Sequence, residues 1–251
     1  MKVYFIGAGP GDPELLTIKG RRIIQEADVI VYAGSLVNPA VLQGHKKEAA
    51  VYDSSSLNLP EVLQIMIEGA KAGKTVARVH SGDPSIYGAV REQVDGLAAQ
   101  GIDCEVVPGV SSFTAAAAAL KAEYTLPGVS QAVILTRQEG RTPVPDGQGL
   151  AELARIRASL AVFLSAHLIE EVAAALIPAY GEDGPAAVVQ KVTWPDEKII
   201  RGTLKDIARK ARKEGIEKTA LVLVGGFLGN RYQFSKLYDP AFSHGFRGGR
   251  P

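Results

Sequence analysis

Residues 1–17 constrain the fold of this 251-residue chain more than any other stretch. Residues 3–6 form a short β-branched and aromatic run that is typical of a buried strand, and they lead into the first loop, Gly7-Ala8-Gly9-Pro10-Gly11-Asp12-Pro13. Its glycines permit a tight turn and a close approach of the backbone to a ligand, while Asp12 and Pro13 suit the N-cap and first turn of a helix. Because open α/β sheets hold small molecules at such strand–loop–helix connections, this opening predicts an enzyme with a small polar cofactor.

Two nucleotide-binding motifs are present only in part. A dinucleotide fingerprint requires a third glycine where the chain has Asp12, and that carboxylate would repel a pyrophosphate at the helix N-terminus. Residues 69–75 resemble a phosphate-binding loop, but Glu68 replaces its first glycine, and a helix precedes the motif where a strand is required. The sequence therefore favours neither motif, and Gly73 is interpreted as the end of a helix.

The composition is typical of a globular protein with little net charge. Apolar residues make up 46% and charged residues 22%, and the net charge of +1 gives no basic field for nucleic acid. Cys104 is the only cysteine, which suits a reducing cytoplasm, and the four histidines show no metal-ligand spacing. Neither a signal-peptide pattern nor an apolar run of about twenty residues occurs. We therefore expect a cytoplasmic protein without a metal, membrane or nucleic-acid partner.

Strand-like and helix-like segments alternate through the first half of the chain. Strands are expected at residues 2–7, 28–32, 49–52, 75–80 and 103–107, and helices at 13–25, 60–72, 85–100 and 111–120. This alternation predicts a βαβ series with a mostly parallel sheet. Pro127-Gly128 then interrupts the pattern, so we expect an N-terminal α/β domain at 1–122, a C-terminal α/β domain at 123–240 and a disordered tail at 241–251.

A second α/β series follows this interruption. Strands are expected at residues 132–135, 160–164, 186–192, 199–200 and 220–224, and helices at 150–156, 168–177 and 204–213. Trp194-Pro195-Asp196 lies between two of these strands and predicts a hairpin, which makes the second sheet mixed. The expected fold class is therefore α/β, with two small domains and a ligand cleft between them.

A second loop, residues 80–88, repeats the pattern of the first. The strand at 75–80 ends in His80-Ser81-Gly82-Asp83-Pro84, so Gly-Asp-Pro again follows an apolar strand and precedes a predicted helix. Both loops should emerge at the carboxyl edge of one parallel sheet and face one site. The alternative interpretation is that each loop is only a helix-entry turn, with aspartate as N-cap and proline at the first helical position.

Three motifs together resemble those of the tetrapyrrole methyltransferases that use S-adenosylmethionine. They are the first loop with its following Glu-Leu-Leu-Thr, the second loop, and Val-Pro-Gly-Val-Ser-Ser at residues 107–112. The resemblance covers about residues 1–228 and implies the tetrapyrrole methylase fold, a homodimer, and S-adenosylmethionine as cofactor. Residues 32–37 and 135–143 are most similar to the members that methylate C11 of precorrin-4 or cobalt-precorrin-4, a step of cobalamin biosynthesis.

The resemblance also implies which residues contact the cofactor. In the first domain these are Pro10, Ser81, Gly82, Asp83, Ile86, Ser111 and Ser112. In the second domain they are Leu164, where relatives often carry methionine, together with Ala187 and Ala220. An apolar wall that includes Ile86 and Leu164 would suit the adenine ring.

The implied substrate is a macrocycle with many carboxylates, which calls for cationic side chains around its site. Arg137 and Arg141 stand just past a predicted strand, and we hypothesise that both bind substrate carboxylates. The alternative is an exposed loop with a surface ion pair to Glu139. The possible bases are His80, Asp12, Tyr87 and His167, and their spacing selects none of them.

Two alternatives for the function stay open at this point. Another member of the same family would act on uroporphyrinogen III, precorrin-2, precorrin-3 or precorrin-6. A non-catalytic module that senses a nucleotide-like metabolite would bind the cofactor without any methyl transfer. The sequence also leaves open whether the macrocycle carries cobalt.

Overall fold

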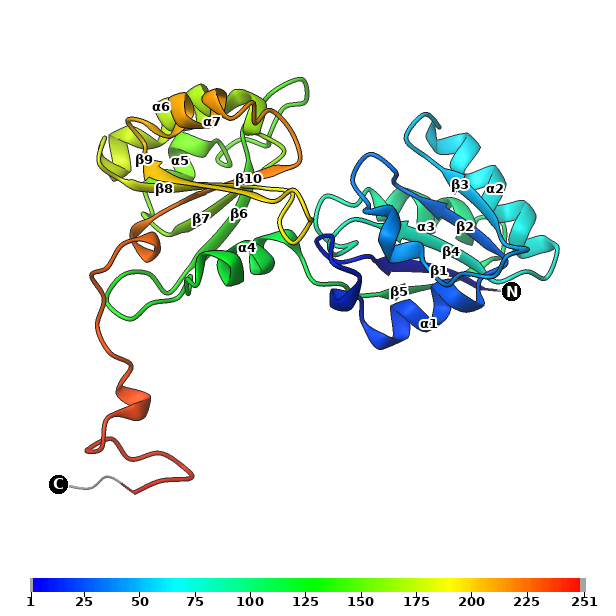
Figure 1. The fold of residues 1–251 in the computed structure, drawn as a ribbon, viewed down its shortest axis with the longest axis horizontal. Coiled ribbons are helices and arrows are strands. Elements are labelled where there is room, and N and C mark those ends of the chain that lie inside the picture. The colour runs from blue at the N-terminus through cyan, green and yellow to red at the C-terminus, as the bar shows by residue number, and fades with distance from the viewer. Residues whose placement is uncertain (1, 249–251) are drawn as a thin grey trace. The chain divides into compact units, whose positions relative to one another are not determined.

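The computed structural model describes residues 2–248, and the contacts within the chain divide it into two units (Figure 1). Unit 1 comprises Met1–Ala119 and Lys191–Glu197, and unit 2 comprises Leu120–Gln190 and Lys198–Pro251. The sequence did not anticipate that residues 191–197 belong with unit 1. The domain boundary between residues 122 and 123 and the disorder of the tail stay predictions, and residues 249–251 lie outside the described part of the chain.

Unit 1 contains a five-stranded parallel sheet, as the alternating pattern predicts. Its strands are β1 (Lys2–Gly7), β2 (Val29–Tyr32), β3 (Ala50–Asp53), β4 (Val76–His80) and β5 (Asp103–Val107), in the spatial order β3-β2-β4-β1-β5. Every neighbouring pair is parallel. The helices along this part of the chain are α1 (Ile18–Glu26), α2 (Leu59–Lys71), α3 (Val90–Ala98) and α4 (Ser112–Leu120).

Both faces of this sheet are covered, because alternate residues of each strand point to opposite sides. On one face, Ile6 and Val79 pack in the same buried cluster as Ile23 and Ile24 of α1. On the other face, a second buried cluster joins strand and helix side chains: Val3, Phe5, Val29, Val31 and Val76 with Val62, Met66 and Ala70 of α2 and Leu97 of α3. The apolar strand runs seen in the sequence are thus the two-sided core of unit 1.

Unit 2 contains a five-stranded mixed sheet. Its strands are β6 (Val133–Arg137), β7 (Ser159–Phe163), β8 (Pro185–Gln190), β9 (Lys198–Thr203) and β10 (Ala220–Val224), in the order β6-β7-β10-β8-β9. Only β6 and β7 are parallel, and the other three pairs are antiparallel. The β8–β9 pair confirms the hairpin predicted around Trp194.

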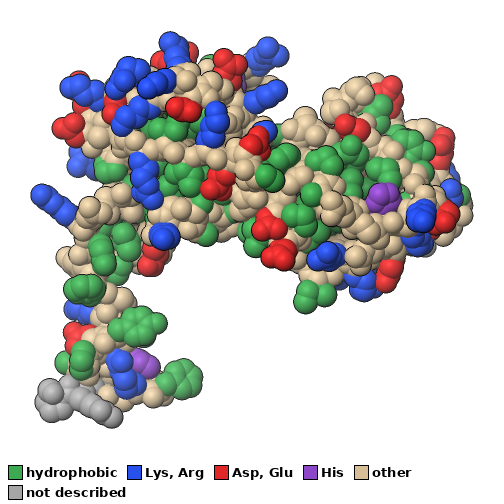
Figure 2. Space-filling model, viewed as in Figure 1, with side chains coloured by type: hydrophobic (Ala, Val, Ile, Leu, Met, Phe, Trp, Pro, Cys, Tyr) green, Lys and Arg blue, Asp and Glu red, His purple; other side chains and the backbone are tan. Residues whose placement is uncertain are grey.

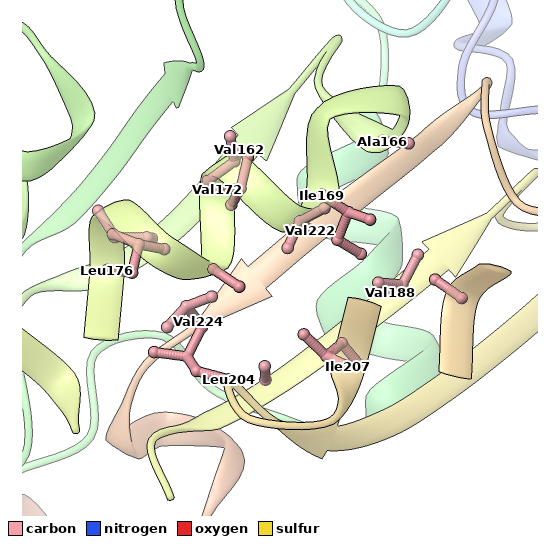
Figure 3. Close-up of a cluster of buried hydrophobic side chains, with 14 of the residues drawn as sticks. Val162, Ala166, Ile169, Val172, Leu176, Val188, Leu204, Ile207, Val222 and Val224 are labelled. Atoms are coloured by element: carbon pink, nitrogen blue, oxygen red, sulfur yellow. The ribbon is translucent and has the colours of Figure 1, made fainter. Parts of the chain in front are cut away.

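One face of this sheet carries the helices α5 (Leu150–Ala154), α6 (Ile169–Tyr180) and α7 (Ile207–Lys213). Figure 3 shows how Val162, Val188 and Val222 of the strands meet Val172 and Leu176 of α6 in one cluster of buried side chains. These valines alternate with residues on the opposite side of their strands, which is the period of two that predicted the strands. The core of unit 2 therefore fixes the positions of its strand ends.

Two predicted helices differ from the structure. The helix expected at 13–25 is divided into the short 3-10 helix Pro13–Leu15 and α1, because Leu16 and Thr17 are extended and the Thr17 hydroxyl caps α1 by accepting from Gly20 N. The helix expected at 85–100 begins only at Val90, since the preceding residues form turns. The second difference falls in the second loop, and the first lies just after the first loop.

Candidate functional site

The first and second loops lie side by side at the carboxyl edge of the sheet in unit 1. They follow β1 and β4, which are parallel neighbours with Gly7 opposite His80. Ala8 N donates to His80 O at 2.7 Å, and Gly9 and Gly82 exchange two backbone hydrogen bonds of 3.2 and 2.8 Å. The structure thus confirms that both Gly-Asp-Pro loops emerge at one sheet edge.

A third loop, residues 108–112, follows β5 and packs against the other two. A Cβ added to Gly109 would lie 2.2 Å from Gly82 O and 2.7 Å from Gly7 Cα. Only glycine permits so close an approach of backbone to backbone, so Gly109 allows the three loops to form one surface. The Gly109 N–H also donates to Asp83 Oδ2 at 2.9 Å, which links the third loop to the second.

Asp83 is an ionised carboxylate within this surface. Burial acts to raise the pKa of its carboxyl, but hydrogen bonds from the Ser85 hydroxyl, Gly109 N and Ser85 N outweigh burial and hold the pKa below its ordinary value. The charge is therefore present at neutral pH. A ligand with a positive group near the three loops would be favoured by it.

The N-cap expected in the helix-entry interpretation is present in the first loop and absent from the second. Asp12 caps the 3-10 helix by accepting from Glu14 N at 2.8 Å. No helix follows Asp83 directly; its Oδ1 accepts from Ser85 N at 2.8 Å, and the chain takes left-handed φ values of 53° at Tyr87 and 48° at Ala89. Strained non-glycine residues of this kind concentrate at functional sites, so the second loop is built for more than entry into α3.

Seven of the ten predicted cofactor residues belong to this three-loop surface or its margin in unit 1. Pro10, Gly82 and Ser111 are buried, whereas Ser81, Asp83, Ile86 and Ser112 are half-buried. Their hydroxyl, carboxylate and backbone groups offer hydrogen bonds to a small polar ligand, and Ile86 offers an apolar contact. The structure brings these residues together, and their contact with a cofactor stays a prediction.

The other three predicted cofactor residues belong to unit 2. Leu164 directly follows β7, is 58% exposed and has a left-handed φ of 53°. Ala220 begins β10, which runs antiparallel to β7, so Leu164 and Ala220 lie at the same end of the mixed sheet. Ala187 pairs with Leu223 further along the sheet and is completely buried. Their role as cofactor contacts stays a prediction.

Arg137 and Arg141 differ in what their guanidinium groups do. Arg137 Nη1 donates to Thr142 O at 3.1 Å, and Nη2 donates to Pro143 O at 2.6 Å. These bonds close the turn that presents Arg141 as an exposed side chain. No ion pair with Glu139 is found for either arginine among residues 2–248, so the surface-pair alternative lacks support in the structure.

Arg78 is a buried arginine of β4, the strand before the second loop, and the sequence did not predict a role for it. Arg78 Nε donates to Gln93 Oε1 at 3.0 Å and Nη1 to Ser54 Oγ at 3.0 Å, and Gln93 Nε2 in turn donates to Ala89 O at 2.9 Å. Burial lowers the Arg78 pKa to about 10, so the group keeps its charge at neutral pH. This network supports the strained end of the second loop, and the signal for it was a charged residue within an apolar strand.

His80 is a poor candidate for a base at neutral pH. It is 5% exposed, stacks on Phe5, and its Nε2 has no hydrogen-bond partner within residues 2–248. Burial, and then the positive charge of Arg78, lower the pKa of His80 to about 3. Of the other possible bases, Asp12 serves as a cap and His167 is an exposed residue of unit 2.

Two further features of residues 2–248 bear on the kind of site. No three or more histidine, cysteine, aspartate or glutamate side chains in this range gather as a metal site would require. Each helix in the same range falls short of the length or the apolar character that crossing a bilayer demands. Cys104 is half-buried in the edge strand β5, and burial, then the Asp103 carboxylate, raise its pKa.

The comparisons with known proteins agree on one family. Residues 2–208 match the family model described as tetrapyrrole (corrin/porphyrin) methylases. The chain is 55% identical over 248 residues to a cobalt-precorrin-4 C(11)-methyltransferase of Methanocaldococcus jannaschii, with 98% of this chain and 96% of that protein covered.

Two solved structures are similar to this one. A cobalt-precorrin-4 methyltransferase involved in cobalamin biosynthesis matches with a TM-score of 0.89 and 48% identity, over 91% of this chain and 96% of that chain. The uroporphyrin-III C-methyltransferase of Thermus thermophilus, in complex with S-adenosylhomocysteine, matches with a TM-score of 0.76 and 29% identity, over 91% and 93%. The fold expected from the sequence motifs is confirmed by these matches.

Proposed function

The chain belongs to the tetrapyrrole (corrin/porphyrin) methylase family, and we propose that it transfers a methyl group from S-adenosylmethionine to C11 of cobalt-precorrin-4 in cobalamin biosynthesis. The observation that carries this proposal is the similarity over nearly the full length of a cobalt-precorrin-4 C(11)-methyltransferase at 55% identity. Precorrin-4, the related substrate without cobalt, is the first comparison for the test below.

The three-loop surface fits S-adenosylmethionine, which carries an ammonium, a carboxylate, a sulfonium and an adenine ring. Asp83 supplies a negative charge that favours the cationic groups. The residues proposed to contact the cofactor are Pro10, Ser81, Gly82, Asp83, Ile86, Ser111 and Ser112 of unit 1 and Leu164, Ala187 and Ala220 of unit 2.

S-adenosylmethionine supplies a methyl group that its sulfonium already activates, so the main task of the protein is to hold the two reactants in line. Holding reactants in a near-attack geometry contributes roughly 7–11 kcal/mol in well-oriented systems. The Gly7, Gly82 and Gly109 contacts hold the three loops in one defined arrangement. No residue is assigned as the base. His80 is unsuited to this role because its lowered pKa means that the imidazole resists taking up a proton.

Arg137, the last residue of β6, and Arg141, in the loop that follows, are proposed to bind substrate carboxylates. Arg141 is exposed, and a guanidinium binds carboxylates in a bidentate manner. Arg137 retains its Nε–H and one Nη2–H, which make no hydrogen bond within residues 2–248, and its other donors fix the turn that carries Arg141.

A homodimer in the cytoplasm is also part of the proposal. The C-terminal segment, residues 229–248, exposes several aromatic side chains, and Figure 2 shows hydrophobic groups along that segment. Phe234 is 88% exposed and Tyr238 80% exposed, while Arg247 holds the segment in shape by donating to Leu237 O and Asp239 O at 2.7 Å. Clusters of exposed aromatic groups are typical of interfaces. Light scattering should give the mass of a dimer for the full chain and a smaller mass for a chain ending at residue 229.

The function is tested by methyl transfer from S-adenosylmethionine with a ¹³C-labelled methyl group. Freshly prepared cobalt-precorrin-4 and precorrin-4 are incubated separately with the protein, and NMR locates the label. We expect the label at C11, with the cobalt form turned over faster. Label at another carbon, or only on uroporphyrinogen III, precorrin-2, precorrin-3 or precorrin-6, would keep the family and reject the proposed substrate. Cofactor binding without transfer to any of them would favour a metabolite-binding module.

A further inference from the structure

The segment Lys191–Glu197, called the strap here, lies against the first loop within unit 1 (Figure 1, yellow turn beside the dark blue loop). It connects β8 to β9 along the chain and holds Trp194, the only tryptophan of the protein. Neither the family motifs quoted above nor the predicted cofactor residues include it. The strap contacts the Pro10-Gly11-Asp12 backbone, which forms the centre of the first loop.

Two hydrogen bonds join the strap to the first loop on either side of Gly11. The Trp194 Nε1–H donates to Pro10 O at 2.9 Å, and Asp12 N donates to Thr193 Oγ1 at 2.9 Å. Both are long-range contacts between residues far apart in the sequence. They fix the orientations of the peptide groups before and after Gly11.

The indole ring also lies directly on the Gly11 backbone. A Cβ added to Gly11 would stand 2.1 Å from Trp194 Cδ1, so no other residue fits under the ring as it lies. Asn38 Nδ2 donates to Gly11 O at 2.9 Å. Side chains from two separate segments therefore hold the same three residues of the first loop.

The strap has a strained shape that several contacts maintain. Lys191 and Thr193 have left-handed φ values of 47° and 68°, which is unusual for a β-branched threonine. Thr193 N donates to Glu197 Oε2 at 2.7 Å, and Lys191 Nζ pairs with Asp196 and lies 5.5 Å from the Trp194 ring centroid. Such strain persists only where the surroundings impose it, and it is concentrated at functional positions.

We propose that Trp194 and Thr193 are positioning residues that hold the first loop in the conformation that binds S-adenosylmethionine. This inference rests on the proposed function, because it assigns the first loop to the cofactor. A loop already held in its binding conformation does not have to be ordered by the ligand, so the cofactor binds more tightly. Releasing one of the two hydrogen bonds should weaken binding about tenfold, as expected for one interaction of this kind.

The test compares the full-length protein with single variants by isothermal titration of S-adenosylhomocysteine. Trp194→Phe keeps an aromatic ring on Gly11 and removes the N–H donor to Pro10 O. Thr193→Val keeps the β-branched shape and removes the acceptor for Asp12 N, whereas Thr193→Ser keeps that acceptor. Tyr52→Phe, at a 41% exposed aromatic in the edge strand β3 and outside the strap, is the matched control.

We expect Trp194→Phe and Thr193→Val each to raise the Kd for S-adenosylhomocysteine about tenfold, and Thr193→Ser and Tyr52→Phe to leave it unchanged. An unchanged Kd in Thr193→Ser together with a raised Kd in Thr193→Val would show that the hydroxyl acceptor positions the loop. Thermal denaturation of each variant, measured in parallel, reports any general loss of stability. An unchanged Kd in both Trp194→Phe and Thr193→Val would overturn the inference alone. If the unmodified protein does not bind S-adenosylhomocysteine, the proposed function fails and the inference with it.

Discussion

His80 illustrates how a single buried side chain ties the stability of unit 1 to pH. Its pKa falls to about 3 in the folded protein because of burial and the charge of Arg78, whereas an unfolded histidine has a pKa of about 6.5. Between these values the unfolded chain binds a proton that the folded chain rejects. The contribution of neutral His80 to the free energy of unfolding is therefore fully present above the unfolded pKa, and it is lost as the pH falls toward the folded pKa.

Removing this group should flatten the acid side of the stability profile. Between about pH 7.5 and about pH 5, His80 accounts for a loss of roughly 2 kcal/mol in the free energy of unfolding. His80→Gln, which does not titrate, should lose correspondingly less over that interval. Urea denaturation at both pH values measures the difference, and an equal loss in the two proteins would show that His80 is not protected from protonation.

Gly109 is the position where the three loops depend most on the absence of a side chain. Gly109→Ala would place a Cβ 2.2 Å from Gly82 O, so the second and third loops must separate. We expect a loss of ~1–3 kcal/mol in stability, as for other overpacked positions, together with weaker binding of S-adenosylhomocysteine. Gly245→Ala is the control, since a Cβ there meets nothing within 4 Å. If Gly109→Ala binds S-adenosylhomocysteine as tightly as the unmodified protein does, the close contact between the loops is not needed for cofactor binding.

Arg141 carries the prediction for the substrate. Arg141→Ala should raise the KM for the tetrapyrrole about tenfold, the effect of losing one charged hydrogen bond, and leave the Kd for S-adenosylhomocysteine unchanged. Arg155→Ala removes another exposed arginine of unit 2 and should change neither. Steady-state kinetics with varied tetrapyrrole measure the effect, and a KM within twofold of the unmodified value would exclude a carboxylate contact at this position.

At the scale of elements, α2 begins with a reciprocal cap. Asn58 Oδ1 accepts from Glu61 N at 3.1 Å, and Glu61 Oε2 accepts from Asn58 N at 2.7 Å. Asn58→Ala should cost about 1 kcal/mol of stability because a helix N–H loses its acceptor. Asn230→Ala, at an exposed position outside any helix, should have no effect on the denaturation midpoint. A midpoint for Asn58→Ala equal to that of this control would mean that water replaces the cap.

Most strands and helices were predictable because their signals are local. The apolar runs of β1, β4 and β10 and the break at Gly73 after α2 need only periodicity and glycine to be recognised. The two helices that were predicted with wrong bounds depend on side-chain hydrogen bonds instead. Thr17 starts a new helix after Pro13–Leu15, and the Tyr87–Ala89 turn is stabilised from outside by the Gln93 side chain. Periodicity does not report such side-chain bonds.

For the molecule as a whole, the sequence predicted two α/β series and the meeting of the first two loops, because carboxyl ends of parallel strands share an edge. It did not predict the bond between Gly109 and Asp83, the strap on Gly11 or the buried Arg78 network. Each of these joins segments far apart in the chain through side-chain geometry. The motifs identified the family, whereas the arrangement of the loops required the structure.

The central claim is that the three-loop surface of unit 1 holds the cofactor of the methyl transfer. A crystal structure of the protein with S-adenosylhomocysteine tests it most directly. We predict density for the ligand in contact with residues 81–83 and with Ser111 or Ser112, at the carboxyl edge of the β4-β1-β5 strands. Density for the ligand away from that edge, with the three loops free of it, would contradict the account.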